Sequence, residues 1–334
     1  MKQQILSPMA LALAATLLGG CSMIPAYHRP AAPVAATWPG EPSATGGSTA
    51  AADVPWQTFF GDPRLHELIE LAMANNRDLR VAVLNIEQAR AQFQIKQADQ
   101  FPTVGAAVAR TPTATGDGTV NVYSAGLGVS NWELDFFGRL GSLKEAARAQ
   151  YLATEEGRKA AQISLIASVA NGYLNLLADN ELLELTRQTL ATRADSLKLT
   201  RLRLDHGAAS ELDSRQAESL FEGAQVTLAQ QQRQRAQDEN ALVLLLGQPL
   251  PQDFFGGSTP PRLADAALLT DLPAGLPSSV LVNRPDVRQA EQQLIAANAN
   301  IGAARAAFFP QITLTAQAGL ASTQLSELFK SGTY

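Results

Sequence analysis

A stretch of 136 residues, from 113 to 248, contains no proline. Proline lacks a backbone donor and clashes with the preceding helical turn, so a stretch without it can form very long helices. Alanine, the strongest helix former, supplies 57 of the 334 residues. Because alanine has a short side chain, helices rich in it can pack closely together. The sequence therefore predicts a mainly α-helical chain with long helices.

Shorter helices are expected before this stretch. Asp62 and Pro63 are typical of a helix start, because an aspartate side chain can accept a bond from the first turn and proline fits the first helical position. We expect a first helix from about Pro63 to Ala74 and a second from Arg77 to about Gln100. The second ends before Phe101-Pro102, since proline disfavours a helical conformation of the residue before it.

The longest predicted element is a helical hairpin. Its outgoing helix, from about Leu140 to Asp205, is 66 residues long and would extend for roughly 99 Å at about 1.5 Å per residue. The turn begins with His206-Gly207, either Ser210 or Asp213 caps the return helix, and the return helix ends near Leu246. Stacking the helix 77–100 on this shorter return helix would nearly make up the difference in length. We expect one stripe on the outgoing helix to be buried: Ile163, Ile166, Ala170, Tyr173 and Leu177.

Residues 103–139 have a different pattern, which predicts a β-hairpin. The glycine-rich turn 116–118 separates two arms of about ten residues each, and in the second arm apolar residues alternate with glycine or serine. This length and alternation fit a tilted transmembrane strand with lipid on one face and water on the other. Tyr123 and Trp132 are candidate membrane-interface aromatics. A water-soluble hairpin that caps a helical bundle fits the same pattern, so the alternation alone leaves both interpretations open.

The helix, the Phe-Pro pair and the strand occur twice, 208 residues apart. Nine identical residues lie in 28 ungapped positions when the segment 75–102 is placed on 283–310. Chance would give two or three, so we interpret this similarity as an internal duplication. Residues 311–334 then supply a third transmembrane strand. A complete second copy would continue for about 128 residues beyond Tyr334, with a fourth strand and a second helical hairpin.

The N-terminus is typical of an exported lipoprotein. A short apolar run follows Lys2 and is too short for a permanent membrane helix, so residues 1–20 are predicted to be a signal peptide. The sequence Leu18-Gly19-Gly20-Cys21 resembles the bacterial lipobox, which implies a covalent lipid such as palmitate on Cys21. Ser22 in the next position resembles the signal for release to the outer membrane. The proline-rich residues 21–62 are expected to form a strap with little helix or sheet.

Composition excludes several other functions. Twenty-six basic against 31 acidic residues leave no basic surface for nucleic acid, and one cysteine with three separated histidines cannot form an ordinary zinc site. No phosphate-binding loop, serine elbow or paired nucleophile is present, so we expect neither a cofactor nor catalysis. His66 and Glu70 lie one helical turn apart, but we interpret them as a solvated helix face rather than as metal ligands.

These features together resemble the outer membrane factor family, the lipoprotein channels of tripartite multidrug efflux pumps. The resemblance is carried by the lipobox and by five further stretches of sequence: Tyr27-His28-Arg29-Pro30, Phe59-Phe60-Gly61-Asp62-Pro63, Asn76-Arg77-Asp78-Leu79, residues 132–139, and Ala304-Arg305-Ala306-Ala307-Phe308-Phe309-Pro310. It implies a homotrimer that forms a twelve-stranded barrel in the outer membrane above a periplasmic tube of helices. It also implies a passive duct for drugs, solvents or other small toxic compounds, which works with an inner-membrane proton-driven pump.

The resemblance further implies that a periplasmic adaptor docks at the hairpin tip, here Gly207, Ala208, Ala209 and Ser210. By its position alone, without the resemblance, Gly207 is better interpreted as a simple helix C-cap. The alternative to a channel is a periplasmic adaptor or scaffold lipoprotein whose hairpins never enter the membrane. With only three strands, we expect this chain by itself to leave unpaired edges in lipid and to fail to seal a trimeric barrel, which would make it a non-functional truncated channel.

The expected organisation has eight segments. In order, these are the signal peptide (1–20), the lipidated strap (21–62), the first-repeat helices (63–102), the transmembrane hairpin (103–139), the long helical hairpin (140–247), a connecting equatorial segment (248–282), the second-repeat helix (283–310), and the third strand with the end of the chain (311–334).

Overall fold

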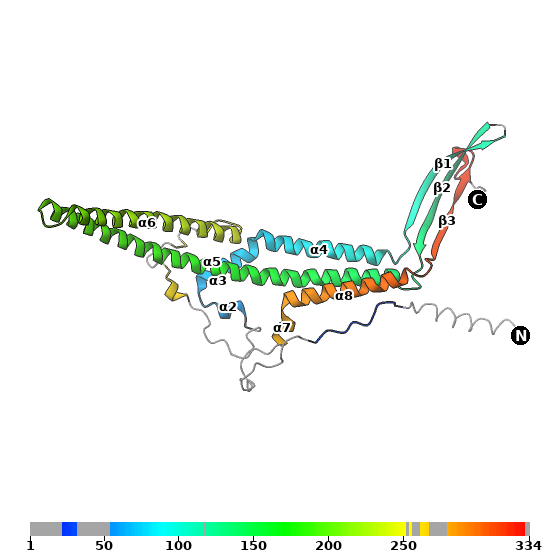
Figure 1. Ribbon diagram of the computed structural model, residues 1–334. Coiled ribbons are helices and arrows are strands. Elements are labelled where there is room, and N and C mark those ends of the chain that lie inside the picture. Colours follow the sequence, from blue (N-terminus) through cyan, green and yellow to red (C-terminus); the bar gives the residue numbers. More distant parts are fainter. Residues whose placement is uncertain are drawn as a thin grey trace. The chain divides into compact units, whose positions relative to one another are not determined.

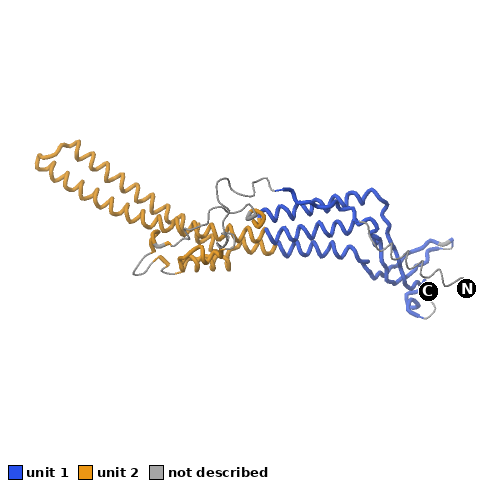
Figure 2. Tube along the Cα trace, turned by 90° about the horizontal axis from the view of Figure 1, so that it is seen from below, with its two compact units in different colours: residues 1–31, 85–156, 286–334 blue, residues 32–84, 157–285 orange. Residues whose placement is uncertain are grey.

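The computed structural model describes residues 22–31, 54–116, 118–251, 254–255, 261–266 and 279–330. The chain divides into two compact units, coloured separately in Figure 2. Unit 1 comprises residues 1–31, 85–156 and 286–334, and unit 2 comprises residues 32–84 and 157–285. Helices α4 (Arg77–Ala98) and α5 (Arg139–Asp205) contribute residues to both units.

The described residues are mainly helical, and the predicted helices form close to their expected bounds (Figure 1). Asp62 caps α3, with its side chain accepting a bond of 2.9 Å from the Arg64 amide, and Pro63 occupies the first turn. Helix α5 is 67 residues long and begins one residue earlier than predicted. The remaining helices are α2 (Trp56–Phe59), α3 (Pro63–Asn75), α6 (Glu211–Leu246), α7 (Ser279–Asn283) and α8 (Pro285–Ala306), with 3-10 turns at Leu263–Asp265 and Leu325–Glu327.

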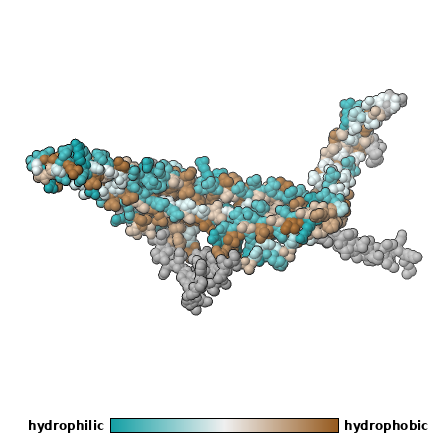
Figure 3. Space-filling model, viewed as in Figure 1, coloured by the Kyte–Doolittle hydropathy of each residue, from teal (hydrophilic) through white to brown (hydrophobic). Residues whose placement is uncertain are grey.

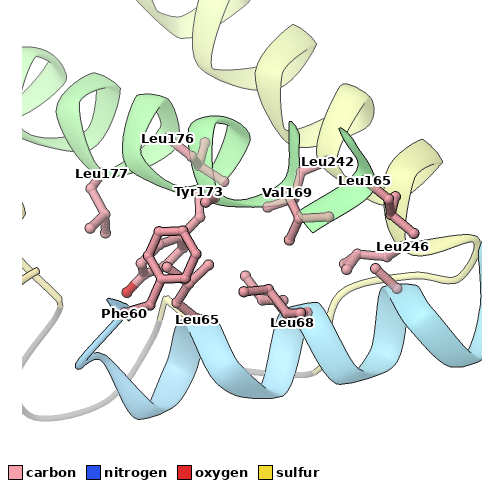
Figure 4. Packing of buried hydrophobic residues seen from close by; sticks show 13 residues of the cluster. Phe60, Leu65, Leu68, Leu165, Val169, Tyr173, Leu176, Leu177, Leu242 and Leu246 are labelled. Atoms are coloured by element: carbon pink, nitrogen blue, oxygen red, sulfur yellow. The ribbon is translucent and has the colours of Figure 1, made fainter. Parts of the chain in front are cut away.

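The core of unit 2 lies where α3, α5 and α6 meet (Figure 4). Leu65 and Leu68 of α3 pack against Val169 and Tyr173 of α5, and Leu242 and Leu246 of α6 complete the cluster. The Tyr173 hydroxyl donates a 2.7 Å hydrogen bond to Asp62 Oδ2, so the buried phenol has a partner. Burial, with this hydrogen bond, raises the pKa of Tyr173.

The predicted buried stripe of α5 is correct at three positions and wrong at Ile163. Ala170, Tyr173 and Leu177 are buried and Ile166 is partly buried, but Ile163 is 56% exposed. Leu165 starts the buried face instead. Ile163 lies two helical turns before Ala170 on nearly the same side of α5, so that side of the helix is covered at Ala170 but not at Ile163.

The C-terminal end of α6 lies against the junction of α3 and α4. Gly247 ends α6 in the left-handed conformation, with φ of 72°, and a Cβ there would lie 2.4 Å from the Asn75 carbonyl oxygen. The Asn76 amide donates a 2.8 Å bond to the Leu245 carbonyl, and α4 begins at the next residue. The predicted meeting of the return helix with the start of helix 77–100 is therefore confirmed at this junction.

Three antiparallel strands form the sheet of unit 1 in the order β1-β2-β3. They are β1 (Val104–Thr115), β2 (Gly118–Glu133) and β3 (Thr313–Ser322). The predicted hairpin and third strand are both confirmed. The duplication is also visible in the helices, because α4 and α8 each have 22 residues and both their ends are related by the same 208-residue offset.

The N-terminal segment 22–31 has no regular secondary structure and packs on α8. Arg29 forms a two-point ion pair with Glu291, and Asn298 donates a 2.8 Å bond to the Pro25 carbonyl. The hydrogen bond from Arg29 holds the pKa of the Glu291 carboxyl below its usual range. Within the described part of the predicted strap, the only helix is the four-residue α2, in agreement with the expectation of little regular structure. The predicted signal peptide, Cys21 and residues 32–53 lie outside the described residues.

Candidate functional site

One face of the β-sheet is apolar across all three strands. In the antiparallel register, Val108 lies opposite Ala125 and Ala125 lies opposite Leu320, so the three side chains share one face. Two further rows on this face are formed by Ala106, Leu127 and Ala318 and by Val104, Val129 and Ala316. Val108 is 80% exposed, and the described chain does not cover this face. Such a surface suits contact with hydrocarbon.

The opposite face carries small or polar side chains and is the concave one. Gly126 and Gly319 lie directly opposite each other on this face. A Cβ on Gly126 would lie 2.7 Å from the Ala318 carbonyl oxygen, and one on Gly319 would lie 2.6 Å from the Ala125 carbonyl oxygen. The same Cβ atoms would lie 2.9 and 2.8 Å from the Cα of the facing glycine, whereas facing Cα atoms in a flat sheet are themselves about 4.5–5.5 Å apart, so the strands curve toward this glycine face. The apolar face is therefore the convex outer surface, as in a barrel with a polar interior.

A β-bulge places Trp132 on the apolar face. Val129 pairs with Ala316 and Trp132 pairs with Leu314, so three steps along β2 match two along β3. The bulge contains Asn131, which has a positive φ of 54°. Uninterrupted alternation would have placed Trp132 on the glycine face. The Trp132 indole donates a 3.3 Å bond to the Gln100 carbonyl beyond the end of α4.

Tyr123 and Trp132 lie near the two ends of the apolar face. Between them β2 advances by nine residues, one of them extra, which gives about 26 Å at about 3.3 Å per residue. A tilt of about 40° would reduce this to about 20 Å along the membrane normal, close to the roughly 25 Å apolar band of outer-membrane barrels. This spacing agrees with interfacial aromatics at both positions, and their assignment stays a prediction.

A rigid connection joins β2 to α5. Glu133 and Arg139 form a two-point ion pair, and Asp135 Oδ2 accepts a 2.7 Å bond from the Gly141 amide in the first turn of α5. The hydrogen bond with Glu133 raises the pKa of Arg139. Phe137 stacks on Phe309 at 4.4 Å between ring centres, which links this connection to the second repeat.

Sequence reasoning missed two exposed aromatics at the same end of the sheet. Phe101 is 66% exposed and Phe308 is 91% exposed, and both lie between a helix of the duplicated unit and the strand that follows it. Phe101 belongs to the repeated Phe-Pro pair, which served above only to identify the duplication, whereas Phe308 aligns with Gln100 and lies just before the second copy of that pair.

The hairpin tip is held by a capping box. The Ser210 hydroxyl accepts a 3.1 Å bond from the Asp213 amide, and Asp213 Oδ2 accepts a 2.9 Å bond from the Ser210 amide, so both of the predicted capping residues take part. The Ser210 hydroxyl also donates a 2.7 Å bond to Asp213 Oδ2, and this bond, together with the one from the Ser210 amide, holds the pKa of Asp213 below its usual range. Gly207 has a φ of 67°, and the Ala208 amide closes the end of α5 on the Arg203 carbonyl at 2.7 Å. Gly207, Ala208 and Ser210 are exposed and Ala209 is partly covered.

His66 does not lie on a solvated face as expected. Its ring contacts Trp56 edge-on at 5.3 Å and hydrogen-bonds to the Phe60 carbonyl, while Glu70 is exposed. The expectation failed because α3 is a core helix, with Leu65 and Ile69 buried beside His66. Within the described residues, no cluster of three His, Cys, Asp or Glu side chains could hold a metal ion.

An acidic pair lies between α5 and α6 in unit 2, with Asp179 buried and Asp238 partly buried. Asp179 is 9% exposed and accepts a 3.2 Å bond from the Gln231 amide, and Asp238 is its acidic neighbour. Burial, together with the hydrogen bond and charge of Asp238, raises the pKa of Asp179 to about 6, against a smaller opposing effect of Arg235. No local pattern in the sequence indicates this pair.

Comparison with known proteins identifies the family. The family model for outer membrane efflux proteins matches residues 68–248 and 276–334. The antibiotic efflux pump outer membrane protein ArpC of Pseudomonas putida and the toluene efflux pump outer membrane protein TtgC of the same species are each 49% identical over 337 residues. Each of these matches covers 98% of this chain and 69% of the relative.

Solved structures agree with this match. The open state of the MtrE outer membrane channel of Neisseria gonorrhoeae is 41% identical, with a TM-score of 0.81 over 94% of this chain and 70% of MtrE. The fold is that of these channels, in which helices form a tunnel below a β-barrel in the outer membrane. The chain therefore belongs to the outer membrane efflux protein family.

Proposed function

We propose that the chain is the outer-membrane exit duct of a tripartite efflux pump and that it carries antibiotics, organic solvents and other small toxic compounds. The observation that carries the proposal is the continuous apolar convex face of β1, β2 and β3, joined through the Glu133–Arg139 connection to long helices. The antibiotic and toluene efflux proteins that resemble the chain support this range of substrates. In a scaffold lipoprotein that stays outside the membrane, such an apolar face would be exposed to water, which is unfavourable.

We propose a homotrimer. In the described sheet β1 and β3 are edge strands, and edges cannot remain unpaired in lipid. About eight strands are the working minimum for a barrel and the described sheet has three, so further strands, including those of other copies, are needed to complete it. The helices of unit 2 also leave large apolar residues exposed, and Figure 3 shows apolar residues interspersed with hydrophilic ones along the helical surface. These residues are Leu182, Leu185, Leu199 and Leu202 of α5 and Leu212, Leu220, Val226 and Leu244 of α6.

The proposed partners are a periplasmic adaptor and an inner-membrane proton-driven pump. We assign adaptor contact to the tip formed by Gly207, Ala208, Ala209 and Ser210. A Cβ at Gly207 would meet nothing within 4 Å, so a partner can approach the backbone there closely. The duct itself would be passive, with no catalytic residue and no cofactor, and the energy for transport would come from the pump.

We propose that Cys21 carries a covalent lipid that anchors the chain in the outer membrane. The neighbouring segment supports this assignment. It runs antiparallel to α8, with Arg29 beside Glu291, Pro25 beside Asn298 and Ile24 beside Gly302. Toward Cys21 it therefore approaches the end of α8 that leads into β3.

Single-cysteine labelling tests the lipid-facing assignment. Leu127→Cys and Val129→Cys place a thiol on the apolar face, and Ser124→Cys places one on the glycine face of the same strand. With the full chain in membranes, we expect a lipid-phase maleimide to label positions 127 and 129, and a water-soluble maleimide to label position 124. Cys21 is blocked where it is lipidated. Equal access of the water-soluble probe to all three positions would contradict the proposal.

A further inference from the structure

The apolar face ends abruptly at one row of residues. Arg110 of β1 lies opposite Tyr123 of β2, and Tyr123 lies opposite Ser322 of β3, so all three share the convex face. Every residue in the three rows between this row and the helices is apolar, but this row contains a cation and two hydroxyls. The row lies on the side of the β1–β2 turn, away from α4, α5 and α8. In a channel whose helices extend into the periplasm, it marks the outer-leaflet boundary of the lipid-facing band.

Arg110 is held in position at this boundary but keeps its charge available. Its Nε donates a 3.1 Å bond to Asn121 Oδ1, which fixes the guanidinium from one side. Within the part of the chain that the structure describes, no carboxylate forms an ion pair with Arg110. An arginine on a lipid-facing strand is costly at the bilayer midplane and nearly free at the interface. The position of Arg110 is therefore compatible with insertion and leaves its two terminal nitrogens free to bind an anion.

We propose that Arg110, with Asn121 and Tyr123, binds the phosphate of an outer-leaflet lipid. A guanidinium offers parallel N–H donors that match two phosphate oxygens. The Asn121 Oδ1 already accepts from Arg110, so its NH₂ group can donate to the same anion, and the Tyr123 hydroxyl adds a donor in the row. The ligand is a lipid rather than a free anion because the group lies on the face proposed to contact hydrocarbon. The inference rests on that part of the proposed function.

The test compares two lipids that differ only in phosphate. Purified full chain in detergent is titrated with bisphosphorylated lipid A and with the same lipid after removal of its phosphates, and bound lipid is counted by native mass spectrometry. We expect the unmodified chain to prefer the phosphorylated lipid about tenfold, as charge-assisted two-point contacts would give. Arg110→Gln should abolish the preference, and Arg110→Lys should keep part of it, because it retains the charge but not the planar fork.

Arg148→Gln is the matched control, because Arg148 is an exposed arginine of α5 outside the sheet and should not affect the preference. Circular dichroism checks that each variant is folded. If Arg110→Gln does not fold, Asn121→Ala carries the test, since it removes the group that fixes the guanidinium and should weaken the preference. Equal binding of both lipids by the unmodified chain, or an equal loss in Arg148→Gln, would overturn the assignment. If the lipid-phase probe labels position 127 but the unmodified chain shows no preference for the phosphorylated lipid, the Arg110 site is refuted. The proposed function as an exit duct would then still stand.

Discussion

At the scale of single residues, a glycine allows close contacts that any side chain would prevent. Gly302 of α8 is buried, and a Cβ there would lie 2.6 Å from the Ile24 side chain and 2.8 Å from Ser142 Oγ. The sequence alone could not single out this glycine, because its neighbours come from the N-terminal segment and from α5. Residues with a local role were predictable, since Asp62 and Ser210 cap helices that begin beside them.

Gly302→Ala should release the N-terminal segment from α8. Alanine gains up to about 1 kcal/mol of helix propensity, but overpacking typically costs about 1–3 kcal/mol and here includes contact with the Ile24 backbone. We expect faster chymotrypsin cleavage at Tyr27 in the folded protein. Gly223→Ala in α6 is the control, because its Cβ would meet nothing within 4 Å and should leave cleavage unchanged. Equal cleavage rates in both variants would show that Gly302 does not seat this segment.

At the scale of elements, helix ends were predictable and strand faces only partly so. Proline, aspartate and glycine act on their own neighbours, so α3, α5 and α6 end within a residue or two of expectation. The bulge at Asn131 depends on pairing with Thr313–Ser322, about 180 residues away, and decides on which face Trp132 lies. The pair of Asp179 and Asp238 likewise forms only when α5 and α6 are in register, which no local pattern in the sequence indicates.

The Asp179 pair predicts that the α5–α6 hairpin is more stable in mild acid. A folded-state pKa of about 6, above the ordinary value, means that the native state binds this proton more tightly than the unfolded state. Stability from this group is full below about pH 4 and is lost as pH rises through about 6, by about 2–3 kcal/mol. Asp179→Asn should flatten the fall in denaturation midpoint between pH 5 and pH 7.5. Asp195→Asn, at an exposed position of α5, should leave this fall in the midpoint unchanged. A steeper fall in Asp179→Asn would reverse the assignment.

At the scale of the whole molecule, the duplicated unit and the order of its motifs indicated the family before any geometry was available. What a single sequence could not separate is burial within one chain from burial between chains. Ile163 and Leu165 are both apolar and only two residues apart, yet Leu165 packs in the core of unit 2 and Ile163 is exposed. Exposed apolar surface of this extent indicates contact with partner chains and with lipid.

Leu127→Arg tests whether that lipid surface controls assembly. Leu127 lies near the middle of the convex face, between the rows of Trp132 and Tyr123. An arginine at the bilayer midplane costs about 2–4 kcal/mol in an outer-membrane barrel, so the membrane-inserted form should fall by about thirtyfold or more. Gln317→Arg is the matched control, because Gln317 lies on the concave polar face of the same sheet, where charge stays in water. Heat-resistant oligomer on gels after membrane extraction gives the readout. If both variants insert equally well, the two faces do not differ in their solvent, and the lipid-facing assignment fails.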